Sequence, residues 1–371
     1  MSQQSELDFI VRKTDWAETR LVERSLEAEL PPGQLLFRVD RFAFTANNIS
    51  YAMAGDLLGY WRFFPAEEGW GRVPAMGFGD VIASTQQGVE VGTRCFGFFP
   101  MSRHLRIEPS HASPTSIVDG VPHRAEIAAV YNTYQPISHD GFYSAEFEDE
   151  LLLLRGLFMT SFLAEDFIAE HGYFDAESVV ISSASSKTSI ALAFRLKETR
   201  GARTIGLTSE GNRDFVEGLG CYDQVLDYEA IDAIPRSSPA IFVDMADNGA
   251  VTRAVHEHLG PNLRYSQSIG GTHWQASGGG EGIPGPKREF FFAPAQIAKR
   301  SKDWGPQGLQ ERLGASLKAF MESSRKWLRV ERDYGPEAVE RVYQSTRAGS
   351  ARPDRGHILS LWDDAGAAAG E

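Results

Sequence analysis

The sequence predicts an α/β protein with a β-rich N-terminal domain and a second domain built on a doubly wound parallel sheet. Between about residues 35 and 109, short alternating apolar runs are cut by Gly and Pro, which is typical of β-strands. The pattern changes at Glu146, where a long segment has apolar residues at helical spacing and no Pro. Beyond residue 177, short apolar runs alternate with helical segments, which indicates strand–helix–strand crossovers.

The β-rich domain is expected to span residues 1–150. Its predicted strands are the runs LLFRVDRFAFT, VPAMGFGDVIAST, TRCFGFFP and HLRIEP. A polar, turn-rich stretch follows over residues 118–141. The segment EFEDELLLLRGLFMTSFLAEDFIAEHGYF is then predicted to be a helix that marks the domain junction.

The second domain is expected to span residues 151–295, with a helical return segment over residues 296–371. Its predicted strands are residues 178–182, 203–209, 223–228, 238–246 and 263–270. Its predicted helices are residues 188–201, 212–220 and 249–260, each ended by Gly. This order predicts a Rossmann-type domain, in which ligands bind at the carboxyl ends of the strands. The candidate binding loops are therefore SSASSKT, LTSEGN, MADN and IGGTHW.

Composition argues against several classes of partner. The 37 basic and 50 acidic residues give a formal net charge of −13, which disfavours binding to nucleic acid or to an anionic membrane. The N-terminus lacks a signal-peptide pattern, and no apolar run approaches the roughly 18 residues of a membrane span, so we expect a cytoplasmic protein. Cys95 and Cys221 lie in apolar surroundings and are expected to be buried thiols, not parts of a disulfide or zinc site.

The order of these regions resembles the medium-chain dehydrogenase/reductase superfamily, particularly its zinc-independent quinone and enoyl reductases, over about residues 35–292. The runs YNTY, GLFMTSF, SSASSKTS, GLTSEGN, LGCYDQVLDY and SIGGTHW also resemble a bacterial family of this superfamily that is described as a domain of unknown function. The resemblance implies a GroES-like N-terminal domain and a small-molecule carbonyl substrate. It also implies a homodimer, in which a buried edge strand formed by FFFAPAQI extends the sheet.

The turn SSASSKT is the candidate loop for binding the cofactor. Zinc-independent relatives often carry G-A-S-G-G-V-G here, and matching the shared Ala-Ser places Ser183, Ser186 and Ser189 where glycines would stand. We expect hydroxyl groups, a lysine and the dipole of the following helix to bind phosphate oxygens. The alternative is that Ser and Thr only cap this helix. The residues expected to contact the cofactor in this turn are Ser183, Ser185, Ser186, Lys187 and Thr188.

The second loop bears on which dinucleotide is bound. NAD-selective domains generally place an acidic residue at the end of the second strand, whereas this strand ends in LTS and the first carboxylate is that of Glu210. Relatives often have a Lys for the 2′-phosphate where this sequence has Asn212, followed by Arg213. The alternative is a solvated loop. The residues expected to form a pocket that favours NADP are Thr208, Ser209, Asn212 and Arg213.

Gly270 ends the fifth predicted strand and His273 follows it, where members of the superfamily close over the nicotinamide ring. We expect both to contribute to cofactor binding. The alternative is that His273 bonds only to the backbone while Trp274 plugs the cleft.

Proton transfer is assigned to tyrosine, because the N-terminal domain has neither a four-cysteine lobe nor a His-Glu pair and no metal is expected. Enoyl reductases of the superfamily have an Asn and, about a dozen residues later, a Tyr, and Asn48 and Tyr60 match this spacing. Tyr51 stands where relatives often carry an acid, and Tyr131 lies in the run YNTYQP. A phenol can polarise a carbonyl and donate a proton to it. The alternative for each tyrosine is a place in the core.

Two hypotheses follow. The first is an NADP-dependent reductase of an enone, quinone or ketone, with a tyrosine as proton donor. The second keeps the fold and the anion site without hydride transfer, as a carbon–carbon lyase, a hydrolase of a keto compound or a ligand-binding protein. Loss of the glycines favours the second, whereas the strand–turn–helix placement of the Ser-rich turn favours the first.

Overall fold

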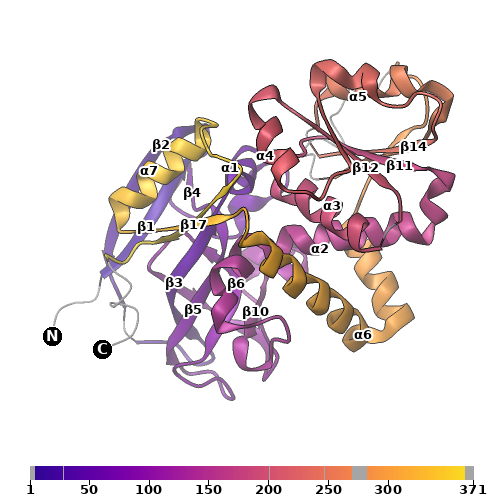
Figure 1. Ribbon diagram of the computed structural model, residues 1–371. Helices are drawn as coiled ribbons and strands as arrows, with labels where there is room; N and C mark the ends of the chain where they lie inside the picture. Colours follow the sequence, from indigo (N-terminus) through magenta and orange to yellow (C-terminus); the bar gives the residue numbers. More distant parts are fainter. Residues whose placement is uncertain (1–4, 28, 200, 246, 270–281, 364–371) are drawn as a thin grey trace. The chain divides into compact units, whose positions relative to one another are not determined.

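The computed structural model describes residues 5–27, 29–199, 201–245, 247–269 and 282–363. It forms two compact units, one made of Met1–Leu153 and Leu328–Glu371 and the other of Leu154–Trp327. The first unit contains two sheets and the second contains one, and each unit has its own hydrophobic core (Figure 1).

The first unit is built mainly from antiparallel strands. Its larger sheet has the order β17-β18-β3-β5-β6-β10-β9-β8, with β7 paired to β3, and its smaller sheet has the order β2-β1-β4. Neighbouring strands are antiparallel apart from β17 and β18, which are parallel. The N-terminal strands are β1 (Ser5–Arg12), β2 (Asp15–Ser25), β3 (Leu35–Phe44), β4 (Trp70–Gly71), β5 (Pro74–Ser84), β6 (Arg94–Pro100), β7 (His104–Ile107), β8 (Pro109–Ser113), β9 (Ser116–Asp119) and β10 (Thr133–Pro136).

Aromatic side chains fill the core of the first unit. Phe37, Phe99 and Tyr134 are buried, with ring centroids 5.1–5.5 Å apart. The buried guanidinium of Arg124 donates hydrogen bonds to the carboxylate of Asp119 and to the hydroxyl of Tyr134, each at 3.0 Å. Since a buried charge is tolerated only when it is paired, these bonds fix the turn-rich segment that leads to β10.

The second unit is a parallel sheet with the order β13-β12-β11-β14-β15-β16 (Figure 1). Numbered in chain order, these strands lie in the sequence 3-2-1-4-5-6, which is the order of Rossmann-type sheets. The second and third strands lie on one side of the first strand, and the fourth to sixth lie on the other side. The predicted Rossmann-type domain and the α/β fold class are therefore confirmed. The elements expected from the sequence are β11 (Ser178–Ile181), α3 (Lys187–Thr199), β12 (Arg203–Thr208), α4 (Arg213–Gly218), β13 (Gln224–Asp227), β14 (Ala240–Asp244), α5 (Gly249–Leu259) and β15 (Leu263–Ser268).

The C-terminal segment differs from the helical return that the sequence predicts. Helix α6 (Ala293–Ser324) belongs to the second unit, whereas β17 (Arg329–Tyr334), α7 (Pro336–Arg347) and β18 (Arg355–Ser360) belong to the first. Strand β18 pairs with β3, and His357 lies opposite Phe44. Local spacing could not reveal these strands, because the partner of β18 lies about 300 residues earlier in the chain.

The strand expected from FFFAPAQI also differs. Strand β16 (Arg288–Phe290) does lie at the edge of the parallel sheet, but it ends before most of that run. Phe291 is buried, whereas Phe290 is 40% exposed and Phe292 is 60% exposed. The run therefore supplies exposed aromatic surface and the start of α6.

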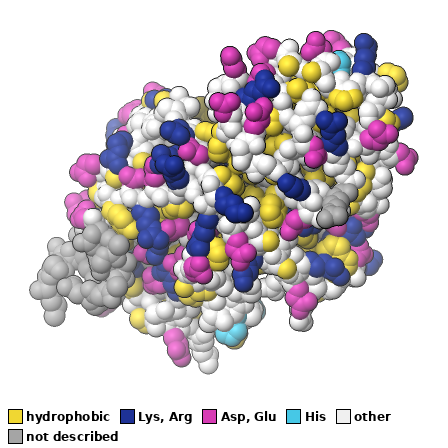
Figure 2. Space-filling view, in the orientation of Figure 1, with side chains coloured by type: hydrophobic (Ala, Val, Ile, Leu, Met, Phe, Trp, Pro, Cys, Tyr) yellow, Lys and Arg dark blue, Asp and Glu magenta, His cyan; other side chains and the backbone are white. Residues whose placement is uncertain are grey.

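Two surface properties bear on partners. In the described part of the chain, no helix is long and apolar enough to cross a membrane. On the face shown in Figure 2, basic and acidic side chains are mixed and do not form separate blocks. Charges mixed in this way do not form the kind of basic patch by which proteins bind a phosphate backbone.

Candidate functional site

The Ser-rich turn lies between β11 and α3, at the carboxyl end of the first strand of the parallel sheet. Ser183 has a φ of 50°, a left-handed backbone conformation that residues other than Gly rarely adopt. Its main-chain N–H donates to the hydroxyl of Tyr228 at 3.1 Å, and that of Ala184 donates to the carbonyl of Leu207 at 2.9 Å. These bonds hold Ser183 in a backbone conformation that glycine adopts more readily.

The serine hydroxyls of this turn differ in what they bind. The hydroxyl of Ser186 accepts a hydrogen bond from the main-chain N–H of Ser189 at 3.2 Å, so Ser186 caps α3. Ser189 is fully buried, and its hydroxyl donates to the carbonyl of Ser182 at 3.0 Å. By contrast, the hydroxyl of Ser183 makes no hydrogen bond with a described residue. The hydroxyl of Ser186 therefore serves as the helix cap, whereas the hydroxyl of Ser183 is available to bind a ligand.

Asn212 joins the Ser-rich turn to the loop after β12. Its side-chain amide donates to the hydroxyls of Ser185 and Ser209, each at 3.2 Å. Thr208, at the end of β12, is buried. The structure therefore brings Ser185, Ser209 and Asn212 together as one polar group at the carboxyl ends of β11 and β12.

Arg213 lies beside this polar group in sequence but is bound to carboxylates. It pairs with Glu217 at 2.9 Å and with Asp227 at 3.1 Å. Its side chain is 44% exposed, so these ion pairs are weak and a competing anion could exchange with them. Glu210 is exposed and makes no ion pair with a described residue.

A glycine on β12 allows the Ser-rich turn to pack closely against this strand. A Cβ added at Gly206 would lie 2.9 Å from the Cβ of Ala184 and 2.9 Å from Cδ1 of Tyr222. The hydroxyl of Tyr222 donates to the carbonyl of Ala184 at 2.9 Å. The close approach of strand, turn and ring therefore depends on the absence of a side chain at Gly206.

A buried carboxylate, that of Asp244, lies at the end of β14 and is not among the site residues expected from the sequence. Asp244 accepts hydrogen bonds from the hydroxyls of Ser182 at 2.8 Å and Thr252 at 3.2 Å. Arg288 donates to it at 2.7 Å from the start of β16. The hydroxyl of Ser182 also accepts from the main-chain N–H of Met245 at 2.8 Å. An acidic residue that ends an otherwise apolar strand, AIFVD, was the signal available.

The three candidate tyrosines lie in one aromatic cluster of the first unit. Tyr51 is on α1 (Ala46–Met53) and Tyr60 opens a short 3₁₀ helix (Tyr60–Arg62), and their ring centroids are 4.6 Å apart. Phe63 connects them to the third tyrosine, with its ring centroid 5.4 Å from that of Tyr60 and 5.5 Å from that of Tyr131. Phe98 lies 5.2 Å from Tyr131. Three tyrosines that are separated by up to 80 positions in the sequence thus belong to one aromatic cluster.

These phenols are protonated and available as donors. Burial raises the pKa of Tyr51, Tyr60 and Tyr131 above the ordinary value, and the neighbouring phenols raise that of Tyr51 further. None of the three hydroxyls makes a hydrogen bond with a described residue. Asn48 differs, because its side chain closes the capping box of α1 with Thr45 and donates to the carbonyl of Pro74 at 2.9 Å.

Gly270 and His273, with the neighbouring Trp274, lie outside the described residues. Over the described ranges, no group of three His, Cys, Asp or Glu side chains is arranged to hold a metal ion. Cys95 and Cys221 are buried, and burial raises the pKa of each thiol to about 12.

Comparison with known proteins identifies the family. The model of a family described as "Protein of unknown function (DUF2855)" matches residues 42–352. A search of the curated proteins found no match.

Solved structures share the fold at low sequence identity. CurA from Vibrio vulnificus is 14% identical, with a TM-score of 0.58 over 96% of this chain and 98% of its own. A putative NADPH:quinone reductase from Mesorhizobium loti is 13% identical, with a TM-score of 0.59 over 97% and 99%. The yhdH oxidoreductase from Salmonella enterica, in complex with NADP, is 12% identical, with a TM-score of 0.54 over 96% and 99%. The chain therefore belongs to the DUF2855 family and shares the fold of these solved structures.

Proposed function

We propose that this protein is a zinc-independent, NADP(H)-dependent reductase that transfers a hydride to an enone, quinone or ketone. The observation that carries the proposal is the Ser-rich turn, which stands where the order of the parallel strands reverses and holds Ser183 in a left-handed conformation. Two structures with the same fold support the choice of cofactor, because they are described as complexes with NADPH and with NADP.

The Ser-rich turn fits a pyrophosphate. The hydroxyl of Ser183 is open, and the first turn of the 13-residue helix α3 presents main-chain N–H groups and the positive end of its dipole. Lys187 adds a cation as the first residue of this helix. Ser189, in the third glycine position, directs its hydroxyl back to the carbonyl of Ser182, so it does not obstruct the turn.

The second loop supports NADP over NAD. Strand β12 ends without a carboxylate, and the groups nearest the Ser-rich turn are the hydroxyls of Ser185 and Ser209 and the amide of Asn212. These groups can donate to a phosphate. Arg213 adds positive charge if its ion pairs with Glu217 and Asp227 are exchanged for the 2′-phosphate.

We assign the proton donor to the tyrosine cluster, with Tyr60 as the first candidate. When bound, NADPH supplies the hydride. The phenol of Tyr60 polarises the substrate carbonyl by donating a hydrogen bond and transfers its proton as negative charge develops on the oxygen. Tyr51 and Tyr131 are the alternative donors in the same cluster, and the rings of Phe63 and Phe98 exclude water around them.

We also propose a homodimer that forms through β16. This strand lies at the edge of the parallel sheet, and edge strands can pair with a second copy of the chain. The exposed rings of Phe290 and Phe292 beside this edge would be covered in such a dimer.

The role of Tyr60 is tested by steady-state kinetics of Tyr60→Phe with NADPH and a panel of enones, quinones and ketones. We expect kcat to fall by about 10²- to 10⁴-fold, as is typical of the loss of a general acid, with unchanged NADPH affinity. Because the pKa of the phenol is raised, wild-type activity should show no loss of the acid below about pH 10.

Tyr51→Phe and Tyr131→Phe are the matched controls, since both remove one hydroxyl from the same cluster. If Tyr60→Phe keeps the wild-type kcat and pH profile, the donor is another tyrosine or water. If NADPH binds but no carbonyl compound is reduced by the wild-type protein, the non-redox hypothesis is supported instead.

A further inference from the structure

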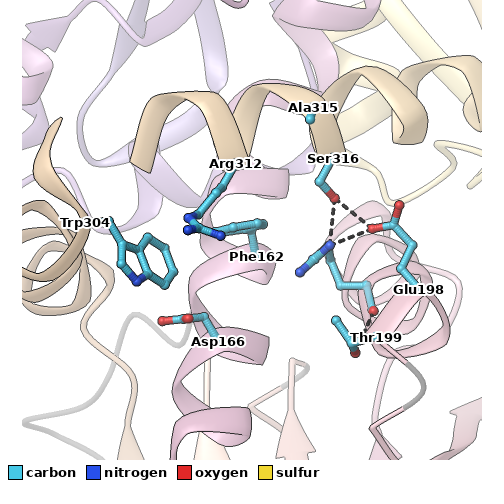
Figure 3. Close-up of a pocket in the computed structure, with 9 residues that line it drawn as sticks. Phe162, Asp166, Glu198, Thr199, Trp304, Arg312, Ala315 and Ser316 are labelled. Atoms are coloured by element: carbon cyan, nitrogen blue, oxygen red, sulfur yellow. Dashed lines mark hydrogen bonds and ion pairs between the residues drawn. The ribbon is translucent and has the colours of Figure 1, made fainter. Parts of the chain in front are cut away.

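A second candidate site lies within the second unit, away from the Ser-rich turn. It is a cavity of about 490 Å³ between α2 (Glu148–Glu170), α3 and α6, shown in Figure 3. Its volume is within the range of small-molecule sites. The side chains that define its chemistry are Phe162, Asp166, Arg195, Glu198, Trp304 and Arg312.

The cavity and the Ser-rich turn lie at opposite ends of α3. The turn precedes Lys187, the first residue of this helix, whereas Thr199, its last residue, lines the cavity. At 1.5 Å per residue, these ends are about 18 Å apart. A ligand in the cavity would therefore be a second molecule and not part of a bound dinucleotide at the turn.

On one side of the cavity, Arg195 is held by a network of ion pairs and hydrogen bonds. The guanidinium of Arg195 is 13% exposed and pairs with Glu165 at 3.1 Å and with Glu198 at 2.6 Å. It also donates to the hydroxyl of Ser316 at 2.9 Å and lies 4.6 Å from the ring centroid of Phe162. These contacts hold Arg195 rigidly and leave the second carboxylate oxygen of Glu198, Oε1, without a hydrogen bond to a described residue.

The other wall carries a cation that is not neutralised in the described part of the chain. Arg312 makes no ion pair there and lies 4.9 Å from the ring centroid of Trp304. Figure 3 shows Arg312, Trp304, Phe162 and Asp166 grouped on this side of the cavity. Oδ2 of Asp166 accepts from Arg300 at 2.6 Å, whereas Oδ1 accepts nothing from the described residues.

We propose that this cavity binds a small zwitterion with a carboxylate and a protonated amine, such as an α-amino acid with an apolar side chain. Arg312 matches the carboxylate, because a guanidinium can bind both of its oxygens. The open oxygens of Asp166 and Glu198 match the ammonium group. The two arginines and two carboxylates of the lining cancel in charge, so a ligand of zero net charge suits the site better than a simple anion or cation. Phe162 and Trp304 offer apolar surface to its side chain.

The proposal is tested by calorimetric titration of the full chain with three related probes. L-phenylalanine carries both charges, 3-phenylpropionate lacks the amine and 2-phenylethylamine lacks the carboxylate. We expect L-phenylalanine to bind with a Kd below about 1 mM and each of the other two to bind about tenfold more weakly or not at all. Arg312→Gln should weaken L-phenylalanine binding by about tenfold or more.

The control variant is Arg264→Gln, which removes an exposed arginine of the same unit on β15, outside the cavity. It should bind L-phenylalanine as the wild type does. Circular dichroism melts of both variants check that they are folded, as expected for exposed positions. The proposal is overturned if L-phenylalanine does not bind at about 10 mM, if either single-charge probe binds equally well, or if the two variants behave alike.

Discussion

Ser183 has an unusual conformation at a position where a dinucleotide-binding turn commonly has glycine. Its φ of 50° costs a residue with a Cβ about 1–2 kcal/mol. We therefore expect Ser183→Gly to raise the free energy of unfolding by about 0.5–1 kcal/mol, since part of the gain is offset by the greater entropy of Gly in the unfolded chain. Denaturant unfolding monitored by circular dichroism measures this change.

Ser185→Gly is the matched control for that prediction. Ser185 lies two residues further on, has no positive φ and binds Asn212, so its replacement by Gly should lower the free energy of unfolding. If both glycine variants destabilise the protein to the same extent, the left-handed conformation of Ser183 is not a source of strain. Strain that survives at such a position is a common mark of a binding site.

At the scale of residues, the sequence identified groups better than it identified individual roles. It assigned Ser209 and Asn212 to one pocket and Ser185 to the Ser-rich turn, which the structure brings together through the side chain of Asn212. It also named three tyrosines that form one cluster. The roles of individual serines depend on hydroxyl directions, which spacing does not determine. The buried carboxylate of Asp244 was missed, because its partners come from β11, α5 and β16 and meet only in the folded sheet.

The start of α3 provides a prediction at the scale of elements. Ser186 caps this helix through the main-chain N–H of Ser189, so Ser186→Ala should lower the free energy of unfolding by about 1 kcal/mol. Ser185→Ala keeps the cap and loses only the hydrogen bond from Asn212, so it should lower the free energy of unfolding by less than Ser186→Ala does. Urea unfolding of both variants measures the difference. Equal effects would show that the cap contributes nothing specific.

The elements that the sequence predicted well are those with strong local signals. The strands and helices of the second unit follow from apolar runs and Gly stops, and their order gives the sheet. The signal is weak where an element depends on distant partners. Strands β17 and β18 were missed because β18 completes its pairing with β3, and α6 contains a kink at Gly305, with a φ of 73°, that divides its periodicity.

The homodimer is a proposal at the scale of the whole molecule. Replacing Phe290 and Phe292 with Lys places two charges beside the edge strand β16, which should repel a second copy. We expect the wild-type protein to sediment as a dimer in analytical ultracentrifugation and the double variant as a monomer. A wild-type monomer, or a double variant that remains dimeric, would contradict an interface at this edge.

The fold class of the whole molecule was predictable because it depends on the order of helices and strands along the chain. Proteins can share this order even when their sequence identity is low. The three solved structures described above are only 12–14% identical to the chain. Cofactor chemistry depends on a few side chains, and three of them are serines where the related motif has glycines. For this reason the fold follows from the sequence, whereas the cofactor requires a measurement.

Titration of the full chain with NADPH and NADH, followed by isothermal calorimetry, tests the central claim most directly. The open hydroxyl of Ser183, the N-terminus of α3 and the polar group of Ser185, Ser209 and Asn212 predict that NADPH binds with a Kd of about 1–100 µM. NADH should bind at least about tenfold more weakly, because it lacks the 2′-phosphate. Absence of binding by either dinucleotide at about 1 mM would contradict the proposed reductase.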